Sequence, residues 1–449
     1  MNREIFRKYD IRGVADRDLD NDTVSKLGYI LGKMAAGGVF AIGRDCRPSG
    51  IRLRDQLAKG ASAAGCSVLD LGEQTTPMTY FAAHTLKPEI TVMITGSHNP
   101  AEYNGFKTMK GLHTLWGDDI VSIREQVAAA EKVTLTKVEM QTVSVREHYM
   151  DRLRSEFAPP VSLKVAVDAG NGTGGDCAID LLTQLGHRVV PLFCDPDGSF
   201  PNHHPDPTVV SNLKTLQETV LSEKCDLGIA FDGDADRLGI VDEKGQIIFG
   251  DRILCVLAEA LLNDNPGATV ISEVKASSVF FSQVESLGGR ALMFPTGHSI
   301  IKEGMHRENA LLAGEMSGHI FFRDRYYGYD DALYAALRFL EIAERAEGPV
   351  SSLTAHLTSV MATPEIREEC EDSVKFVLVE KVKQLLLEQN YPVDDTDGVR
   401  VEFQNGWGLL RASNTQPVLV MRFEAGTFDQ LKEYEEKIRT ILHTAREDL

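Results

Sequence analysis

The sequence predicts an α/β fold with three related domains and a smaller C-terminal α+β domain. Short apolar runs, typical of buried strands, alternate with amphipathic helical stretches. A succession of strand, turn, helix, strand and polar turn recurs three times, by pattern and not by sequence identity. The residues after 360 instead combine two helical stripes with a hairpin sheet. A chain of 449 residues has room for three or four such domains.

The predicted elements give the approximate limits of these domains. Buried strands are expected at 39–42, 90–94, 165–167, 227–231, 270–271, 311–313, 399–403, 408–410 and 418–423. In the tail, apolar residues recur at helical spacing over 374–386 and 431–442. We therefore place the domains at 1–143, 144–246, 247–360 and 361–449.

The net charge restricts the partners of this chain. Lys and Arg number 47 against 66 Asp and Glu, so the formal net charge is −19. Such a surface repels polyanions, and we therefore expect neither nucleic acid nor an anionic membrane as a partner. An anionic small substrate would need a local basic pocket.

The cysteines and the N-terminus predict a cytoplasmic protein. The seven cysteines lie far apart, include no C-x-x-C pair and are odd in number, which is typical of reduced thiols and not of disulfides or a zinc site. The first residues carry scattered charges and no apolar stretch, so we expect no signal peptide. No apolar run approaches the length of about 18 residues that a membrane span needs.

Three aspartates alternate directly after the predicted strand at 227–231. On an extended segment, Asp232, Asp234 and Asp236 would face the same side. Three hard oxygen donors so close together favour a cation such as Mg²⁺. An EF-hand loop is one alternative, but it needs glycine where Arg237 stands and helices where strands are predicted. A solvated acidic turn is the other.

A hydroxyl group follows the predicted strand at 90–94, in the sequence TGSHNP at 95–100. Such a turn exposes the Oγ atom of Ser97, as a nucleophile or a phosphoryl carrier requires. It is not the G-x-S-x-G turn of hydrolases, because Thr95 and Asn99 occupy the glycine positions. A helix N-cap serine is the structural alternative. The sequence NGFK at 104–107 adds a cation near the same turn and favours the functional interpretation.

A glycine-rich turn at 170–175 favours a different class of protein. It matches G-x-G-x-x-G between a strand and a helix, with Asp195 after the next strand, as in dinucleotide-binding dehydrogenases. However, Asp168 stands where a pyrophosphate would have to approach. A turn that needs glycine only for close packing is the alternative, and we rank NAD binding below the metal site.

Two later turns carry groups suited to a phosphorylated sugar. The sequence GEMSGH at 314–319 offers a carboxylate, a hydroxyl and an imidazole, which together can recognise sugar hydroxyls. The sequence RASNT at 411–415 offers a guanidinium, two hydroxyls and an amide, which suit a phosphate. Either turn is also compatible with a purely structural role. The whole set indicates phosphoryl transfer on a small phosphorylated molecule.

At these residues the chain resembles the bacterial phosphomannomutase/phosphoglucomutase family of the α-D-phosphohexomutase superfamily. The motifs that carry the resemblance, in chain order, are YDIRG at 9–13, TGSHNP at 95–100, FPNHHPDP at 200–207, DGDADR at 232–237, GEMSGH at 314–319 and RASNTQP at 411–417. The resemblance implies three related α/β domains and a smaller C-terminal one around a central cleft. In order, they would carry the phosphoserine, metal-binding, sugar-recognition and phosphate-binding loops.

The resemblance also implies roles for individual residues. The magnesium ligands would be Ser97, which is also the phosphoserine, and Asp232, Asp234 and Asp236. The catalytic positions would be Ser97, His98, Lys107, Arg237 and His319, with Lys107 and His319 as acid/base candidates. The positions that match substrate-binding residues are Tyr9, Arg12, Lys275, His298, Glu315, Ser317, Arg411, Ser413, Asn414 and Thr415.

The implied activity is the interconversion of hexose 1-phosphate and hexose 6-phosphate, with mannose or glucose as the sugar. Phosphoserine would form a hexose 1,6-bisphosphate, which would also serve as activator, and the protein would be a cytoplasmic monomer. Met316 resembles the mannose/glucose branch, whereas the glucosamine branch tends to carry Gln there. The alternatives are a phosphoglucosamine mutase, a non-catalytic sugar-phosphate-binding paralogue and, last, an NAD-dependent oxidoreductase.

Overall fold

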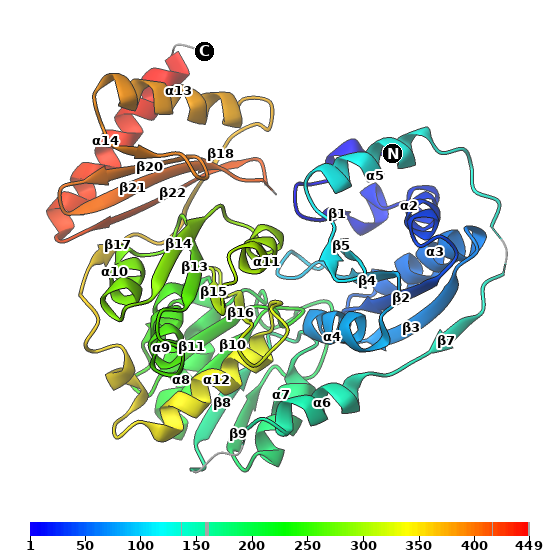
Figure 1. Ribbon diagram of the computed structural model, residues 1–449, viewed down its shortest axis with the longest axis horizontal. Coiled ribbons are helices and arrows are strands. Elements are labelled where there is room, and N and C mark those ends of the chain that lie inside the picture. Colours follow the sequence, from blue (N-terminus) through cyan, green and yellow to red (C-terminus); the bar gives the residue numbers. More distant parts are fainter. Residues whose placement is uncertain (136, 158–160, 415, 448–449) are drawn as a thin grey trace. The chain divides into compact units, whose positions relative to one another are not determined.

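The computed structural model describes residues 1–135, 137–157, 161–414 and 416–447. Its three α/β sheets and its antiparallel C-terminal sheet confirm the predicted fold class. The chain divides into two compact units. One comprises residues 1–257 and 317–354, and the other comprises 258–316 and 355–449. Figure 1 labels their elements along the chain.

The first sheet has the strand order β1-β5-β4-β2-β3-β7, with β6 paired to β5. Its parallel centre is β4-β2-β3, because β2 pairs in parallel with both neighbours. The strands are β1 (Ile11–Val14), β2 (Val39–Arg44), β3 (Ser67–Glu73), β4 (Ile90–Ile94), β5 (Tyr103–Lys110), β6 (His113–Thr114) and β7 (Met140–Thr142). The helical elements of this region are η1 (Arg3–Ile5), α1 (Ala15–Asp18), α2 (Asn21–Met34), α3 (Ser49–Ala63), α4 (Thr76–Leu86) and α5 (Asp118–Ala129).

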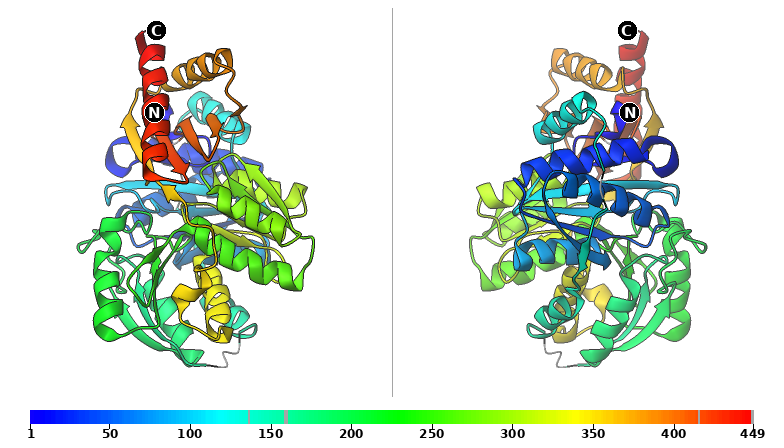
Figure 2. Two further views of the ribbon diagram at one scale, coloured as in Figure 1. Left: turned by 90° about the vertical axis from the view of Figure 1, so that its left-hand side faces the viewer. Right: turned by 90° about the vertical axis from the view of Figure 1, so that its right-hand side faces the viewer.

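Apolar runs decide the centre of this sheet. Every residue of β4 is buried, as expected for a strand covered on both faces. The turns that follow β2 and β4 therefore leave the sheet at the same edge, because neighbouring parallel strands point the same way. In the right-hand view of Figure 2, the blue helices α2 and α3 lie over these strands.

The second sheet has the order β12-β11-β10-β8-β9. β10 pairs in parallel with β8 and antiparallel with β11, so the sheet is mixed. The strands are β8 (Lys164–Asp168), β9 (Arg188–Leu192), β10 (Leu227–Phe231), β11 (Leu238–Asp242) and β12 (Ile247–Ile248). The other elements of this unit are α6 (Arg146–Arg154), α7 (Gly175–Gln184), η2 (Val210–Leu213), α8 (Lys214–Glu223), β16 (Ile320–Phe322), α12 (Ala332–Arg345) and η3 (Val350–Leu353), while α9 (Gly250–Asp264) runs past residue 257.

In the second unit, β13 pairs in parallel with β14 and β15. The bounds here are β13 (Thr269–Glu273), α10 (Ser278–Ser286), β14 (Arg290–Phe294), α11 (His298–Arg307) and β15 (Leu312–Gly314). A wholly antiparallel sheet of order β17-β22-β21-β20-β19, with β18 beside β22, forms the C-terminal domain. Its elements are β17 (Met361–Ala362), β18 (Ile366–Glu369), α13 (Lys375–Glu388), β19 (Val393–Asp394), β20 (Val399–Phe403), β21 (Gly406–Ala412), β22 (Val418–Ala425) and α14 (Phe428–Glu447).

Helices α13 and α14 cover one face of the antiparallel sheet (Figures 1 and 2). The predicted apolar stripe of α14 is confirmed, since Leu431, Tyr434 and Ile438 are buried. The stripe predicted for α13 is partly wrong. Val377 is 54% exposed because the helix turns Leu378 and Val382 toward the sheet.

The opposite face of the same sheet carries a buried polar cluster. The Arg400 guanidinium lies 3.9 Å from the centre of the Trp407 ring and donates hydrogen bonds to the Val274 and Ala276 carbonyls. The Trp407 indole N–H donates to Glu424. These contacts hold the turn after β13 against the antiparallel sheet. Among the described residues, no helix is both long and apolar enough to span a membrane.

Helices α2 and α3 pack so closely that two glycines are required. A Cβ atom on Gly28 would lie 2.1 Å from the Leu57 carbonyl oxygen, and one on Gly60 would lie 2.1 Å from the Ser25 carbonyl oxygen. We expect Gly28→Ala to lower the free energy of unfolding by about 1–3 kcal/mol, because the helices must separate. Gly50→Ala in α3 is the control, since its Cβ has no neighbour nearer than 3.5 Å. Urea denaturation should show this control unchanged or up to about 1 kcal/mol more stable; equal losses would contradict the packing argument.

The buried Asp331 carboxylate predicts a pH-dependent stability. It accepts hydrogen bonds from the Tyr149 and Tyr326 hydroxyls and from the Tyr334 N–H, yet burial raises its pKa to about 6. As the pH rises, Asp331 loses its proton in the unfolded chain before it does so in the folded protein. The contribution of Asp331 to the free energy of unfolding is therefore complete below the ordinary pKa of 3.8 and is lost as the pH rises through about 6. The full loss is about 3 kcal/mol, of which about 1 kcal/mol falls between pH 5 and pH 7.

The measurement is the free energy of unfolding of the wild type and of Asp331→Asn at a series of pH values. The difference between the two proteins should change by about 1 kcal/mol from pH 5 to pH 7, with the wild type losing stability. A difference that stays constant would mean that the pKa of Asp331 is not raised.

Candidate active site

An acidic turn at 232–237 joins β10 to β11 and holds three buried carboxylates. Asp232, Asp234 and Asp236 are each 0% exposed, and each offers an oxygen within 4.8 Å of the others. The expected extended segment is wrong, because Ala235 has a left-handed φ of 58° and the chain folds back there. The expected convergence of three carboxylates is confirmed.

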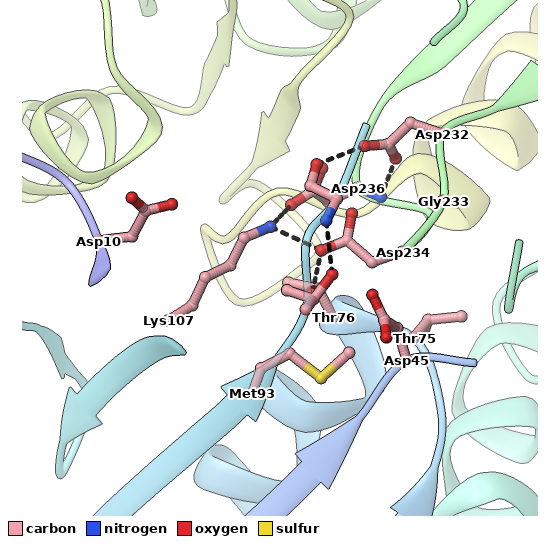
Figure 3. A network of polar contacts seen from close by, with 12 residues as sticks. Asp10, Asp45, Thr75, Thr76, Met93, Lys107, Asp232, Gly233, Asp234 and Asp236 are labelled. Carbon is pink, nitrogen blue, oxygen red and sulfur yellow. Dashed lines mark hydrogen bonds and ion pairs between the residues drawn. The ribbon is translucent and has the colours of Figure 1, made fainter. Parts of the chain in front are cut away.

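Lys107 supplies an ammonium group to this turn from β5. Its Nζ atom donates to Asp234 Oδ2 at 2.7 Å and to Asp236 Oδ2 at 2.5 Å, as Figure 3 shows. Burial lowers the pKa of Lys107, but these carboxylates raise it by more, so the net shift is upward. In this arrangement the ammonium group donates hydrogen bonds to two of the three carboxylates.

Asp232 accepts hydrogen bonds from a hydroxyl and two backbone N–H groups, whereas Lys107 contacts the other two aspartates. Its Oδ2 accepts from the Ser97 hydroxyl at 2.8 Å, and its Oδ1 accepts from the backbone N–H groups of Asp236 and Arg237 at 3.1 Å each. Burial and the charges of Asp236 and Asp234 raise the pKa of Asp232 well above its usual range. For Asp236, burial acts in the same direction, but Lys107 and His319 hold its pKa well below the usual range.

These observations fit a divalent cation. One ammonium group cannot balance three buried carboxylates, and burial together with the charges of Asp236 and Asp234 raises the pKa of Asp232. In addition, Oδ1 of Asp234 is buried and has no hydrogen-bond partner among the residues that the structure describes. Hard carboxylate oxygens are the ligands that Mg²⁺ prefers.

Ser97 is not on an exposed turn, which corrects the sequence prediction. It is 2% exposed, has a left-handed φ of 49°, and places Oγ 3.1 Å from the His98 Nδ1 atom. The acidic turn covers it, because a Cβ on Gly233 would lie 2.6 Å from the Ser97 carbonyl oxygen. The hydroxyl therefore faces the carboxylates and not solvent.

Arg47, which the sequence analysis did not identify, holds in place the loop that carries Ser97. This serine loop comprises residues 96–103. Its guanidinium is 0% exposed and pairs with Asp45 through Nε at 3.1 Å. Its other donors reach the carbonyls of Ser97, Asn99, Pro100 and Tyr103. A Cβ at position 96 would lie 2.5 Å from the Arg47 Cζ atom, so a larger residue there would displace the guanidinium. The role of Arg47 follows from the parallel pairing of β2 with β4, because this pairing places the turns after the two strands side by side.

A histidine and an arginine extend the polar cluster. His319 Nε2 lies 3.2 Å from Asp236 Oδ1 and accepts from the Arg237 Nε–H at 3.3 Å, while its Nδ1 lies 3.2 Å from the Ser317 Oγ atom. Asp330 is also 0% exposed and places an oxygen within 4.8 Å of His319 and Asp236. The sequence analysis did not include Asp330.

Two N-terminal residues from the YDIRG motif lie in the same unit. Arg12 donates to Asn99 Oδ1 at 3.0 Å and to Asp10 Oδ2 at 2.5 Å, so it contacts the serine loop directly. Tyr9 precedes this ion pair and is 7% exposed.

In the second unit, Glu273 organises three turns at the ends of the parallel strands. One carboxylate oxygen accepts from the Lys275 N–H at 2.8 Å and the Thr296 hydroxyl at 2.9 Å, and the other accepts from the Met316 N–H at 3.2 Å. The Glu315 carboxylate accepts from the Gly297 N–H at 2.7 Å. A single buried carboxylate thus fixes the turns that carry three predicted substrate-binding residues, which are Lys275, His298 and Glu315.

Asp397 connects these turns to the predicted phosphate loop. Its Oδ2 atom accepts from the Thr296 N–H at 3.0 Å and from the Arg411 Nε–H at 2.9 Å. Lys275 pairs with Glu365 at 3.1 Å, and burial lowers its pKa less than Glu365 and Glu273 raise it. The sequence analysis identified neither Glu273 nor Asp397.

The predicted phosphate loop, residues 411–417, begins at the end of β21. The Ser413 N–H donates to the Val418 carbonyl at 3.0 Å, and its Oγ accepts from the Gln416 N–H at 3.2 Å. Asn414 follows and is partly exposed, whereas Thr415 lies outside the described residues. The first unit therefore contains Tyr9, Arg12, Ser97, His98, Lys107, Asp232, Asp234, Asp236, Arg237, Ser317 and His319. The second holds Lys275, His298, Glu315, Arg411, Ser413 and Asn414.

Comparison with known proteins identifies the family. Models described as the three alpha/beta/alpha domains and the C-terminal domain of phosphoglucomutase/phosphomannomutase match residues 3–134, 147–245, 249–360 and 365–441 in order. The chain belongs to the phosphoglucomutase/phosphomannomutase family. The resemblance found in the sequence is therefore confirmed.

Relatives of this family match nearly the whole chain. A phosphomannomutase/phosphoglucomutase of Pseudomonas putida is 43% identical over 98% of this chain and 95% of its own length. A phosphoglucomutase of Neisseria gonorrhoeae is 41% identical over 99% and 98%. A crystal structure of a family protein from Burkholderia thailandensis superposes with a TM-score of 0.92 at 38% identity, and covers 99% of this chain and 98% of that chain.

Family membership agrees with the geometry of the glycine-rich turn, which argues against dinucleotide binding. The Thr173 N–H donates to the Gly233 carbonyl at 3.0 Å, and the Gly172 N–H donates to the Ala169 carbonyl at 2.7 Å. A Cβ on Gly172 would lie 2.7 Å from the Gly233 oxygen. The turn therefore uses its glycines and N–H groups to pack on the acidic turn, and not to approach a pyrophosphate.

The role of Arg47 can be tested without measuring catalysis. Lysine keeps the positive charge but has three donors, so Arg47→Lys leaves at least two acceptors without a partner. We expect the free energy of unfolding to fall by about 2–4 kcal/mol. Hydrogen–deuterium exchange should accelerate in the serine loop, residues 96–103, under native conditions.

The control for this variant is Arg52→Lys, which alters an arginine of the same domain that is 32% exposed. It should leave exchange in residues 96–103 unchanged. Equal exchange rates in the Arg47→Lys protein and the wild type would show that Arg47 does not hold the loop.

Proposed function

We propose that this chain interconverts hexose 1-phosphates and hexose 6-phosphates, with mannose or glucose as the sugar, through a phosphoserine at Ser97. The observation that carries the proposal is the position of the Ser97 Oγ atom, 2.8 Å from Asp232 within a cluster of three buried carboxylates. Relatives that are 43% and 41% identical over almost the full length are named phosphomannomutase/phosphoglucomutase and phosphoglucomutase.

A magnesium ion would be held by Ser97, as its phosphoryl oxygen, and by Asp232, Asp234 and Asp236. When bound, it would neutralise part of the negative charge on the phosphoryl group. The buried Oδ1 of Asp234 supports this assignment, since it lacks a hydrogen-bond partner among the described residues. Arg237 lies beside the same cluster and would contact the phosphoryl oxygens.

Proton transfer would be carried by residues around the serine. Lys107 and His319 both contact Asp236, and we assign them as the acid/base pair, with His98 hydrogen-bonded to the serine hydroxyl. In the first transfer the hexose hydroxyl loses its proton as it attacks phosphorus, the bond between phosphorus and the Ser97 oxygen breaks, and the Ser97 oxygen gains a proton to become a hydroxyl. On the return transfer, the serine hydroxyl loses the proton and the product hydroxyl gains one, so the sum of the two steps is neutral.

The intermediate of this sequence is a hexose 1,6-bisphosphate. It must turn over between the two transfers so that its other phosphoryl group returns to Ser97. The same bisphosphate would act as activator, because it can phosphorylate a serine that has lost its phosphoryl group.

The remaining predicted residues would bind the sugar phosphate. Arg411, Ser413, Asn414 and Thr415 would hold the phosphate that is not transferred, and Glu315 and Ser317 would hold sugar hydroxyls. Tyr9, Arg12, Lys275 and His298 would each contact the substrate as well. These groups supply the local positive charge that an anionic substrate needs on a chain with a net charge of −19. The domain limits, the monomeric state and the cytoplasmic location stay predictions.

A phosphorus NMR time course tests the proposed reaction. Mannose 1-phosphate is mixed with the protein, Mg²⁺ and a trace of glucose 1,6-bisphosphate, and the 6-phosphate signal should appear. Ser97→Ala should lower the rate by about a thousand-fold or more, because the phosphoryl carrier is lost. Ser122→Ala, on the exposed part of α5, should keep the wild-type rate.

Repeating the time course with glucose and glucosamine phosphates ranks the sugars. A faster rate with glucosamine 6-phosphate would replace the proposal with the phosphoglucosamine mutase. No conversion of any of the three sugars would favour the non-catalytic paralogue. Full turnover by Ser97→Ala would exclude the phosphoserine relay.

A further inference from the structure

The two carboxylate oxygens of Asp234 have different surroundings. Oδ2 accepts a hydrogen bond from the Thr76 hydroxyl at 2.6 Å and another from the Lys107 ammonium at 2.7 Å. Oδ1 is buried and has no hydrogen-bond partner among the residues that the structure describes. Two donors therefore occupy one oxygen and leave the other available to a cation.

Thr76 also contacts the backbone of the acidic turn. Its N–H donates to the Asp234 carbonyl at 3.0 Å, so one residue of the first domain binds both the main chain and the side chain of an aspartate 158 positions later. Figure 3 shows the threonine beside Asp234, on the side of the turn where Lys107 also enters. This pair of contacts sets the position of the aspartate and the rotation of its carboxylate.

The start of α4 makes Thr76 a rigid donor. Thr75 caps this helix by accepting the Met78 N–H with its hydroxyl, and Thr76 is the first helical residue and 0% exposed. The N–H groups of a first turn have no partner within the helix, and the helix N-terminus carries a partial positive charge. A β-branched side chain at that position has few rotamers. The hydroxyl and the N–H therefore meet Asp234 with little loss of conformational freedom.

We propose that Thr76 is a positioning residue of the metal site, which orients Asp234 so that Oδ1 faces the cation. The inference rests on the proposed metal site, because it assigns the ligand oxygen of one of its aspartates. Thr76 does not itself bind the metal. Groups that hydrogen-bond metal ligands typically contribute 10- to 100-fold to metal affinity.

The test compares the affinity of four purified variants for Mn²⁺ and Mg²⁺. Thr76→Val removes the hydroxyl and keeps the shape, whereas Thr76→Ser keeps the hydroxyl. Thr79→Val is the matched control, because Thr79 is a buried threonine of the same helix whose hydroxyl contacts Gln74 and the Thr75 carbonyl instead of Asp234. Asp234→Asn is the reference for loss of the ligand itself.

The metal affinity is read from the electron paramagnetic resonance signal of free Mn²⁺ and from calorimetric titration with Mg²⁺, in the absence of any sugar phosphate. Thermal denaturation of the same metal-free proteins measures the cost of losing a buried hydroxyl. A merely structural role would lower the melting temperature of Thr76→Val and Thr79→Val alike and would leave both affinities unchanged.

We expect Thr76→Val to bind Mn²⁺ and Mg²⁺ about 10-fold or more weakly than the wild type. Thr76→Ser and Thr79→Val should stay within about two-fold of it. If Asp234→Asn loses binding while Thr76→Val retains it, the inference is overturned and the metal site stands. If the wild type binds neither ion, or if Asp234→Asn binds as the wild type does, the metal site of the proposed function fails, and the inference fails with it.

Discussion

The structure of the first unit depends on three carboxylates that one turn buries together. Asp232, Asp234 and Asp236 are each 0% exposed, and ionised groups cannot remain so close in a protein interior without compensating charge or donors. Each finds a different solution. Asp232 accepts from the serine hydroxyl and two backbone N–H groups, Asp234 accepts from a threonine and a lysine, and Asp236 pairs with that lysine and contacts His319. Lys107 on β5, Ser97 in the turn after β4 and Thr76 at the start of α4 all meet the turn between β10 and β11, so the carboxylates link the first sheet and its helices to the second sheet.

Buried charged groups also hold the turns that lie outside the cluster of three carboxylates. A fully buried guanidinium, Arg47, holds the carbonyls of the serine loop, and a fully buried carboxylate, Glu273, holds three turns of the second unit. In both places a charged side chain forms hydrogen bonds with backbone groups. Hydrogen bonds to a charged group are stronger than those between neutral groups, and losing the charged partner leaves buried groups unpaired. Side chains that are expected to touch substrate are thus carried on turns whose shape other side chains determine.

Much of the fold and part of the site were predictable from local pattern. Strands such as 90–94 and 227–231 are short apolar runs bounded by polar turns, and the structure has them at these positions. The acidic turn and the serine turn follow such strands, so their chemistry was recognisable. The residues that organise them were not. Arg47, Thr76, Glu273 and Asp397 lie in turns or at the ends of helices and strands, without a distinctive motif. Their partners are up to 158 positions away.

The sequence by itself determined the order of strands, helices and polar turns, and the chemical groups that each turn carries, because these depend on residue type and on spacing along the chain. The tertiary structure alone decided that Ser97 is covered, that Asp234 keeps one oxygen free of hydrogen bonds among the described residues, and that Val377 faces solvent. Burial and hydrogen bonding depend on which distant segments meet. A donor such as Thr76 acquires its role only when folding brings its hydroxyl within 2.6 Å of the aspartate.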